Sequence, residues 1–560
     1  MKRNSFVCLL LSVVLMAACA GEPVKSDEAA CEEAIAVISE CTGVTPPFPS
    51  EGCLSEYADA ADRVTAEGCG ALDMSDGKAD AGGFFCWPIN RWFGLCNEDT
   101  LSEAGAIASL EDVCGGADTA LCDALRVRDF LSAGAEARRL VAETDRETVL
   151  SNPAFRYYVR ERIVSLLVYN VVTDLGRTTV DVATYRDSAD AVLSEHYPAY
   201  EPESFAMARE AAPPAPAETC STPRAGLLIY PGVVRLTDRA EFDEQRAALA
   251  TALPCLAVER VETGSFVDPE INAQQAVAPV EALRAAHGDI PFHLLGYSQG
   301  SRNSLQTLID HPSIASSVQS VVTLNSAAHG SEVADTFHTA LSFLEGSDEA
   351  CDWVDDIARP MCLWAAERSV QPSAGILRLI ATAMGVPIED LSAFIAAEDG
   401  VAAAPNLSAF LRAHLPGVLS LTTSAAADFW RDQAPALPRH VMYLSFRSVV
   451  SDRDANLPNS NALSFDLLRN AGGTSPWNDM QVRLANQRIG GPVQDLEVVE
   501  PVAEGNHWQW ELATGAVPEN VMPADMTERI PHEALLVAHY QALAEVGLLY
   551  AASAPSGSGI

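Results

Sequence analysis

The chain has 560 residues, of which 48% are hydrophobic and 20% are charged. This is a globular composition, and the length is enough for two or three domains. The formal net charge of −40 argues against nucleic acid and anionic lipid surfaces as partners, because both repel an acidic protein. The same charge favours a well-solvated, exported protein.

The N-terminus has the three parts of a secretory signal. Two basic residues at 2–3 precede an apolar run at 6–16, and two alanines lead to Cys19. The run is too short to span a membrane. Its small-small-Cys ending resembles a bacterial lipobox, which predicts a lipoprotein signal at 1–19 and a lipid on Cys19 that anchors a cell-envelope lipoprotein to the membrane. The alternative is an ordinary cleaved signal, which predicts an extracellular protein.

Cysteine usage indicates an oxidising compartment. Of the fourteen cysteines, Cys8 and Cys19 belong to the signal, which leaves an even number of twelve. Disulfides are the natural state for most of them. Eight lie within residues 20–122, without Cys-x-x-Cys pairs or accompanying histidines. This stretch is therefore predicted to be a disulfide-rich module and not a zinc site. Its connectivity and its partner stay open.

Two further cysteine pairs are close enough in the sequence for local disulfides. Cys351 and Cys362 would close a single loop. Cys220 and Cys255 would tie the segment before one expected strand to the start of the next. Both pairings are hypotheses.

Residues 123–210 change to a helical pattern. Apolar side chains recur at helical spacing from Leu131 onward and form a dense face at 164–171. We expect these helices to bury that face in a core. Residues 211–223 are rich in proline and alanine, a stiff and poorly helical composition. A domain boundary is predicted there.

After residue 224, short apolar strands alternate with helices. Such alternation predicts a doubly wound α/β domain with a mostly parallel sheet over residues 224–548, followed by a flexible tail at 549–560. Reactive groups in such sheets collect at the carboxyl ends of the strands. The expected strands are 225–230, 255–261, 290–295 and 317–324, and the expected helices are 240–253, 271–286 and 299–310.

The stretch Gly296-Tyr297-Ser298-Gln299-Gly300 ends one of these strands and begins a helix. A serine in a sharp strand-to-helix turn is held in a strained conformation that exposes its hydroxyl, and the flanking glycines remove Cβ atoms that would clash. The backbone N–H of Gln299 and the positive end of the helix point to the place where an oxyanion would form. Ser298 is therefore the candidate nucleophile.

Further stretches accompany this motif in a fixed order. They are Pro231-Gly232-Val233, residues 323–335, residues 419–423, residues 475–482 and Asn506-His507. With Gly-x-Ser-x-Gly, they resemble the motifs of bacterial lipases of the α/β-hydrolase superfamily, over about half of the chain. The resemblance implies the α/β-hydrolase fold, an oxyanion N–H from Val233, the triad acid Asp479 and the triad base His507.

The chain departs from the lipase pattern at three positions. Pro231 stands where the lipases have histidine, and Met480 stands where they have the glycine after the acid. Gln509 stands where calcium-binding members have aspartate. Calcium is therefore not carried over, and neither a metal nor a cofactor is predicted.

The order of the triad residues supports the assignment independently of the resemblance. In α/β-hydrolases the serine comes first, then the acid, then the histidine, and Ser298, Asp479 and His507 follow that order. His507 would take the proton of Ser298 and return it to the leaving alcohol. The acid has a competitor, because Asp452 follows an expected strand at 440–448, where many such enzymes keep their acid. The local resemblance favours Asp479 and leaves Asp452 in reserve.

Residues 335–438 interrupt the alternation with a helical segment rich in large apolar side chains, among them Trp353 and Trp364. Lids and acyl-chain pockets are found at this point of the fold, and an apolar face that opens to water needs a lipid partner. We expect a lid or substrate cap. The alternative is a helical subdomain with its own core.

The sequence thus predicts a serine hydrolase of carboxylic esters, with lipids as the expected substrates. A polymer esterase or a thioesterase of the same fold would carry the same serine motif. A non-catalytic surface-binding lipoprotein is the remaining alternative, because a fold does not by itself fix a function.

Overall fold

The computed structural model describes residues 109–115, 119–233, 238–264, 267–335, 416–451, 477–507, 509–510 and 532–550, with single positions 338, 465 and 468. The chain divides into two compact units, Met1–Glu98 and Asp99–Ile560, and every described residue belongs to the second. Cys19, Asp452, the Cys351 and Cys362 pair and most of the 335–438 insertion lie outside the described residues. No described helix is both long and apolar enough to cross a membrane.

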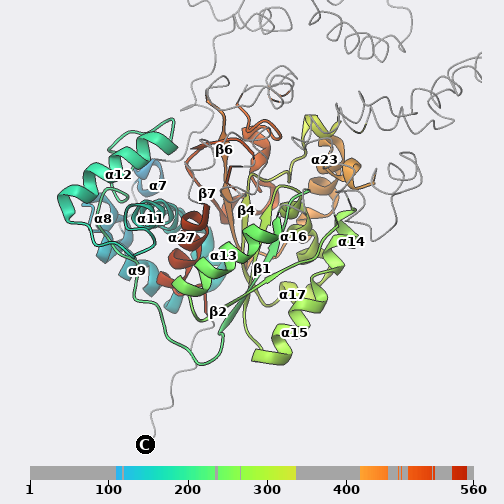
Figure 1. Ribbon diagram of the computed structural model, residues 1–560, viewed down its shortest axis with the longest axis horizontal. Helices are drawn as coiled ribbons and strands as arrows, with labels where there is room; N and C mark the ends of the chain where they lie inside the picture. Colours follow the sequence, from blue (N-terminus) through green and yellow to red (C-terminus); the bar gives the residue numbers. More distant parts are fainter. Residues whose placement is uncertain are drawn as a thin grey trace, which may run out of the picture. The chain divides into compact units, whose positions relative to one another are not determined.

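In the described part of the chain, six parallel strands form the central sheet in the order β2-β1-β3-β4-β5-β7 (Figure 1). β1 and β3 are buried at every position, as expected for strands covered on both faces. The five strands predicted from the sequence are present, each within two residues of its predicted ends, and β7 is the sixth strand of the sheet. Their bounds are β1 Ala225–Tyr230, β2 Leu256–Arg260, β3 Phe292–Tyr297, β4 Val318–Leu324, β5 Met442–Phe446 and β7 Glu497–Val499.

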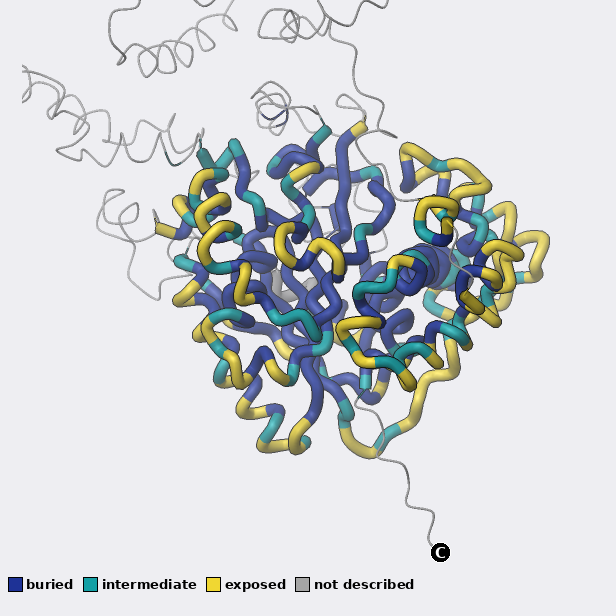
Figure 2. The backbone as a smooth tube through the Cα atoms, turned by 180° about the vertical axis from the view of Figure 1, so that it is seen from behind, coloured by how far each residue is buried: buried dark blue, intermediate teal, exposed yellow. Residues whose placement is uncertain are grey.

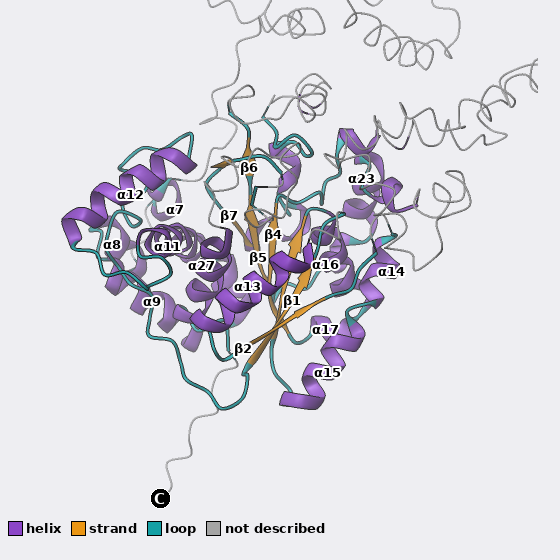
Figure 3. Cartoon of the chain, viewed as in Figure 1, coloured by secondary structure: helices purple, strands orange, loops and turns teal. Residues whose placement is uncertain are grey.

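Helices cover both faces of this sheet (Figure 3). On one face, α13 (Asp238–Ala252) packs against α27 (His532–Glu545). The other face carries α14 (Pro269–Gln274), α15 (Val277–His287), α16 (Gln299–Asp310), α17 (Pro312–Ala315) and α23 (Thr423–Asp432). Figure 2 shows the consequence: the interior is buried, and the exposed positions lie on the outer turns of the helices and on loops.

The helix predicted at 271–286 is two helices, α14 and α15, separated at Gln275 and Ala276. Pro279 stands in the first turn of α15. In one continuous helix its ring would clash with the carbonyl of Gln275, so the helix restarts before it. The periodicity of the apolar side chains does not register this break.

The helices that precede the Pro/Ala segment share the core of the sheet. α11 packs against α27 and β7, and the buried residues of all three belong to one hydrophobic cluster. The sequence placed a domain boundary at 211–223, yet an extended segment can also bridge two parts of one core, as it does here. These helices are α7 Leu110–Cys114, α8 Ala120–Arg126, α9 Phe130–Glu143, α10 Arg146–Ser151, α11 Pro153–Val172 and α12 Val182–His196.

α11 has the character of a central helix. Asn152 caps its first turn through its side-chain oxygen, Pro153 occupies the first helical position, and most of its residues are buried. The dense apolar face predicted at 164–171 lies in the core as expected, with Val164, Leu167 and Val168 buried. The expectation for α9 was wrong at Leu131, which is 85% exposed, because α9 turns the small residues Ala133 and Ala137 inward instead.

Two disulfides lie in the described residues. Cys114 and Cys122 join α7 to α8, and both come from the predicted disulfide-rich stretch. Cys220 and Cys255 join the segment before β1 to the start of β2, which confirms the pairing proposed from the sequence. This second bridge fixes the entry of the chain into the sheet.

Candidate active site

Ser298 lies where the strand order reverses between β1 and β3, at the carboxyl end of β3. Its backbone is strained, with φ at +49° and ψ at −118°. A Cβ on Gly300 would stand 2.1 Å from the carbonyl oxygen of Tyr230, and one on Gly296 would stand 2.5 Å from the Cα of Ser301. The glycines are therefore required by close backbone approach, as the sequence predicted.

Three predicted residues from distant parts of the chain meet at this point. The hydroxyl of Ser298 lies 2.8 Å from Nε2 of His507, and Nδ1 of His507 lies 2.7 Å from Oδ2 of Asp479. All three side chains are buried. Because a carboxylate can only accept, Nδ1 carries the proton and Nε2 is left to accept from the serine. This is the tautomer that a general base next to a hydroxyl needs.

A tight turn fixes the carboxylate of Asp479. Its Oδ1 accepts the backbone N–H groups of Gln481 and Val482, at 3.0 and 2.7 Å, while Oδ2 faces His507. Met480, which lies between Asp479 and Gln481 in the sequence, has φ at +77°, a left-handed conformation that favours glycine. The departure noted in the sequence therefore places a methionine in a backbone conformation that glycine adopts more easily. Asp452 lies outside the described residues.

The predicted oxyanion groups come from the loop after β1 and from the start of α16. Val233 is half-buried in the loop after β1, and Gln299 is the first residue of α16. Gly232 lets the loop approach, since a Cβ there would stand 2.8 Å from the Tyr297 ring and 3.4 Å from Cβ of Ser298. The side chain of Gln299 donates to the carbonyl of Val267 at 3.1 Å and so points away from the role assigned to its backbone.

The loop that carries His507 is closed by its own side chains. Oε1 of Gln509 accepts the backbone N–H of Asn506 at 2.7 Å, and the N–H of Gln509 donates to Oδ1 of Asn506 at 3.2 Å. Gln509, the residue noted in the sequence as a departure from the lipase pattern, thus closes the loop that carries His507 through two hydrogen bonds. The sequence contains Gln509 but gives no sign of this role, which depends on the fold of the loop.

Two further histidines, the buried His293 and the half-buried His329, have structural surroundings. His293 lies between the hydroxyl of Ser320 and the carbonyl of Leu549, and burial lowers its pKa to about 4. The ring of His329 stacks on Trp430 with centroids 4.5 Å apart, and burial lowers its pKa. Neither faces the Ser298 hydroxyl through a hydrogen bond in the described structure. These contacts give both rings structural roles.

His539 of α27 behaves differently. Its Nδ1 lies 2.8 Å from the carbonyl of Leu535 and its Nε2 lies 2.6 Å from Glu500. A backbone carbonyl and a carboxylate are both acceptors, so these two contacts favour the ring with a proton on each nitrogen. Burial opposes this charge, but attraction to Glu500 and the two hydrogen bonds outweigh it and raise the pKa of His539. The pair joins α27 to the chain that follows β7.

Sequence reasoning also missed Arg302, one helical turn after Ser298 on α16. Its guanidinium lies over the ring of Phe429 on α23, 3.1 Å from the ring centroid, and donates to Oε1 of Gln306. Burial lowers its pKa to about 9. This contact fixes the end of the 335–438 insertion to the helix that follows the nucleophile.

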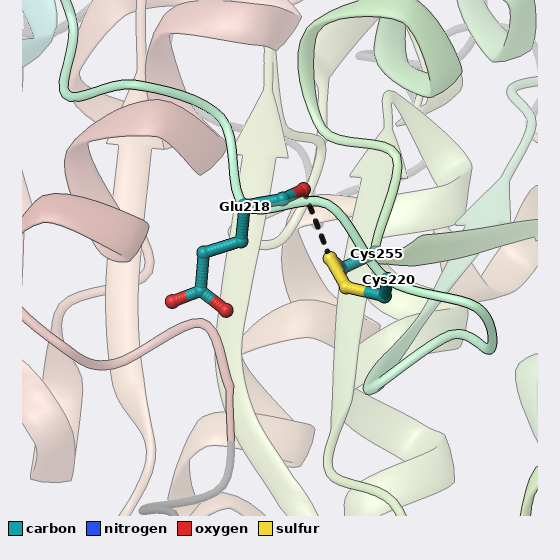
Figure 4. A group of neighbouring side chains, drawn as sticks. All are labelled: Glu218, Cys220 and Cys255. Carbon is teal, nitrogen blue, oxygen red and sulfur yellow. Dashed lines mark hydrogen bonds between the residues drawn. A yellow bond between two sulfur atoms is a disulfide. The ribbon is translucent and has the colours of Figure 1, made fainter.

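Among the described residues, one group of side chains comes within metal-ligand distance of one another: Glu218, Cys220 and Cys255 (Figure 4). The two cysteines are bonded to each other, and a disulfide sulfur is not the thiolate that binds a metal. Glu218 is exposed and alone cannot hold an ion. The group is therefore a disulfide with a nearby carboxylate.

Solved structures that resemble this one are carboxyl esterases and lipases. A metagenomic carboxyl esterase matches with a TM-score of 0.39 and 18% identity, over 64% of this chain and 90% of its own. The mature form of a lipase from Bacillus licheniformis matches with a TM-score of 0.30 and 17% identity, over 53% and 87%. A highly thermostable carboxyl esterase from Bacillus coagulans, in complex with glycerol, matches with a TM-score of 0.24 and 13% identity, over 40% and 72%.

The sequence matches no protein-family model and has no significant match among curated proteins. We therefore infer function from the side chains of this chain.

Proposed function

We propose that this protein is a serine hydrolase that cleaves carboxylic esters through an acyl-enzyme. One observation carries the proposal: a continuous line of hydrogen bonds runs from Ser298 through His507 to Asp479, at 2.8 and 2.7 Å. A serine hydroxyl is a weak nucleophile until a base takes its proton, and this line supplies the base and the group that orients it.

The proposed reaction has two halves. In the first, Oγ of Ser298 attacks the ester carbonyl carbon while its proton passes to Nε2 of His507, and the imidazolium then returns that proton to the departing alkoxide. The acyl group stays bound to Oγ. In the second half, His507 takes a proton from water, the resulting hydroxide attacks the acyl carbon, and a carboxylic acid leaves as Oγ regains its proton. Asp479 stays ionised and stabilises the imidazolium in both halves.

The negative charge that develops on the carbonyl oxygen is assigned to the backbone N–H groups of Val233 and Gln299. Two observations support this assignment: the backbone of Gly232, next to Val233, approaches Cβ of Ser298, and Gln299 begins α16, where the positive end of the helix dipole adds to the effect. Such donors act strongly here because the site is largely shielded from water.

An apolar acyl group is the substrate portion that the surroundings favour. A small hydrophobic cluster, separate from the main core, contains Ala327, Leu421 and Val482, with Val233 and Ala334 packed against it. Its backbone touches the site at two points: the N–H of Val482 donates to Oδ1 of Asp479, and the N–H of Ala327 donates to the carbonyl of Ser298 at 3.3 Å. We propose that this cluster, with the 335–438 insertion as a lid or cap, receives the acyl chain of a lipid.

The decisive experiment compares wild type and Ser298→Ala on p-nitrophenyl esters of increasing acyl length, an emulsified triglyceride and an acyl thioester. We expect ester hydrolysis by the wild type and its loss in Ser298→Ala. Activity that survives in Ser298→Ala would reject the assignment. A wild type that no serine-reactive fluorophosphonate labels would instead favour a non-catalytic scaffold.

A proposal on localisation rests on the N-terminal sequence alone. We propose a cell-envelope lipoprotein anchored through a lipid on Cys19. Mass spectrometry of the N-terminal peptide from the native host tests this: a diacylglyceryl cysteine is expected, and an unmodified N-terminus at another residue would exclude it.

A further inference from the structure

The backbone of His507 is bound on both sides. Its carbonyl accepts two hydrogen bonds, from the hydroxyl of Tyr297 at 2.5 Å and from Nδ2 of Asn325 at 3.2 Å. Its N–H donates to the carbonyl of Asp479 at 2.8 Å. These bonds are separate from those of the imidazole ring, and none of them involves an atom that reacts.

The two donors come from neighbouring strands of the sheet. Tyr297 is the last residue of β3 and directly precedes Ser298, and Asn325 directly follows β4. β3 and β4 are paired up to Tyr297 and Leu324, so the donors start from adjacent positions at the carboxyl edge. The histidine loop is thereby connected to the turn that carries the nucleophile by a route other than the Ser298 hydroxyl.

Asn325 is itself held in place. Its φ of +44° is left-handed, a conformation that asparagine tolerates better than most residues. Its N–H donates to the carbonyl of Phe446 at 3.2 Å, and its Oδ1 accepts the hydroxyl of Ser448 at 3.0 Å. Both anchors lie on or just after β5. With Oδ1 occupied in this way, Nδ2 is directed at His507.

Water does not compete for these bonds. Tyr297 is 3% exposed, Asn325 is 0% exposed and His507 is 1% exposed. Hydrogen bonds in such an environment are electrostatically stronger than in water and tolerate little displacement.

We propose that Tyr297 and Asn325 are positioning residues that hold the backbone of His507 at a fixed distance from Ser298 while the proton moves. The inference rests on the proposed ester-hydrolase function. The hydrogen bond between Ser298 and His507 is lost when the serine attacks, so it cannot keep the imidazole in place through the reaction. The two bonds to the His507 carbonyl do not change in either half of the reaction, and so they can.

Tyr297→Phe isolates the hydroxyl, because phenylalanine keeps the ring that lies 5.2 Å from the imidazole. We expect kcat to fall roughly 10- to 100-fold with KM changed by less than about twofold, since a small misplacement of a catalytic group lowers the rate and not substrate binding. The matched control is Tyr443→Phe. It removes the hydroxyl of a buried tyrosine that donates to the carbonyl of Pro438 at 2.9 Å, near the amino end of β5 and so at the edge of the sheet opposite to Ser298. The control should keep wild-type kcat.

Asn325→Gly is the second variant, because glycine adopts a left-handed φ without strain and only the amide is lost. If both donors hold the same carbonyl, their effects on kcat should not multiply. The fold-change in kcat of the double variant Tyr297→Phe/Asn325→Gly should differ by more than about twofold from the product of the two single fold-changes. Effects that simply multiply would reject a joint role.

A spectroscopic measurement separates this inference from the proposed function. The proton between Nδ1 of His507 and Asp479 should give a far-downfield proton NMR signal, assigned by its loss in His507→Gln. Tyr297→Phe should shift or broaden that signal and Tyr443→Phe should not. If the wild type hydrolyses no ester, the proposed function fails, and the signal still decides the positioning role. A Tyr297→Phe variant that matches Tyr443→Phe in both kcat and signal would overturn it.

Discussion

Arg162 of α11 and Glu545 of α27 form a largely buried ion pair across 383 positions of sequence, with Nε to Oε2 at 2.7 Å and Nη2 to Oε1 at 2.8 Å. The same guanidinium donates to the carbonyls of Ala212 and Pro213. One side chain thus joins the N-terminal helices, the Pro/Ala segment and the last helix. This junction explains why a composition typical of a linker does not separate two domains here.

Arg162→Met should lower the free energy of unfolding by about 3 to 5 kcal/mol, because it leaves the Glu545 carboxylate buried without its cation. Urea denaturation followed by circular dichroism measures this. The double variant Arg162→Met/Glu545→Met should recover most of the loss. Arg139→Met is the control, since its pairs with Glu136 and Glu143 are open to solvent and their loss should change the free energy of unfolding far less than Arg162→Met does. A single variant as stable as the control would show that the pair contributes little.

Asp479→Asn should reduce kcat by about 10⁴-fold on a p-nitrophenyl ester while the protein folds normally. The carboxylate enforces the proton on Nδ1 of His507, whereas an amide can present a donor and leave the wrong tautomer. Asp452→Asn is the matched control and should keep wild-type kcat. An active Asp479→Asn together with an inactive Asp452→Asn would reverse the assignment of the acid.

Gly300→Ala should lower kcat by about 10²-fold or more, because the added methyl displaces the segment that leads to Val233 and its oxyanion N–H. The new Cβ would meet two backbone oxygens, of Tyr230 at 2.1 Å and of Pro231 at 2.6 Å, and neither can rotate away. Gly134→Ala is the comparison: its Cβ would meet only the side chain of Tyr158. The kcat of both variants is measured over the same series of substrate concentrations. Equal kcat values would contradict the steric argument.

His293 should make stability fall in acid. Its folded-state pKa of about 4 lies below the ordinary value of 6.5, so the unfolded chain binds the extra proton first as the pH falls. The contribution is fully present above pH 6.5 and is lost progressively toward pH 4, amounting to about 2 kcal/mol between pH 7 and pH 5. Urea denaturation at these two pH values measures it.

His293→Gln provides the reference for that pH dependence, since glutamine keeps a polar group near Ser320 and Leu549 but does not titrate. The difference between the two pH values should shrink by about 2 kcal/mol in this variant. An unchanged difference would place the acid sensitivity in other groups.

The sheet and the nucleophile turn could be predicted because their signals are local. A strand buried on both faces is a continuous apolar run, as in Ala225–Tyr230, and the glycines around Ser298 mark a backbone contact that nothing larger allows. The triad could be proposed because serine, acid and histidine follow one another along this chain in the order typical of α/β-hydrolases. In the structure His507 lies 2.8 Å from Ser298 and 2.7 Å from Asp479.

What could not be predicted depends on contacts between distant segments. Periodicity shows that α11 has apolar faces but does not name α27 as the helix that covers them. Leu131 fits the helical spacing and is nevertheless exposed. Tyr297 and Asn325 are ordinary polar residues in the sequence, and only the folded loop gives them a shared acceptor in His507.

The packing of α11 against α27 also constrains how a nascent chain can fold. α11 leaves the ribosome early, with buried-type side chains around most of its circumference. Its partner is among the last segments to be synthesised. Until α27 is synthesised, α11 lacks the helix that covers its apolar face. The contact between the two helices also closes a loop of several hundred residues, which is slow. We expect this interval to make the unfinished chain a strong client of chaperones, and a chain that stops short of α27 to be degraded instead of accumulating as a smaller enzyme.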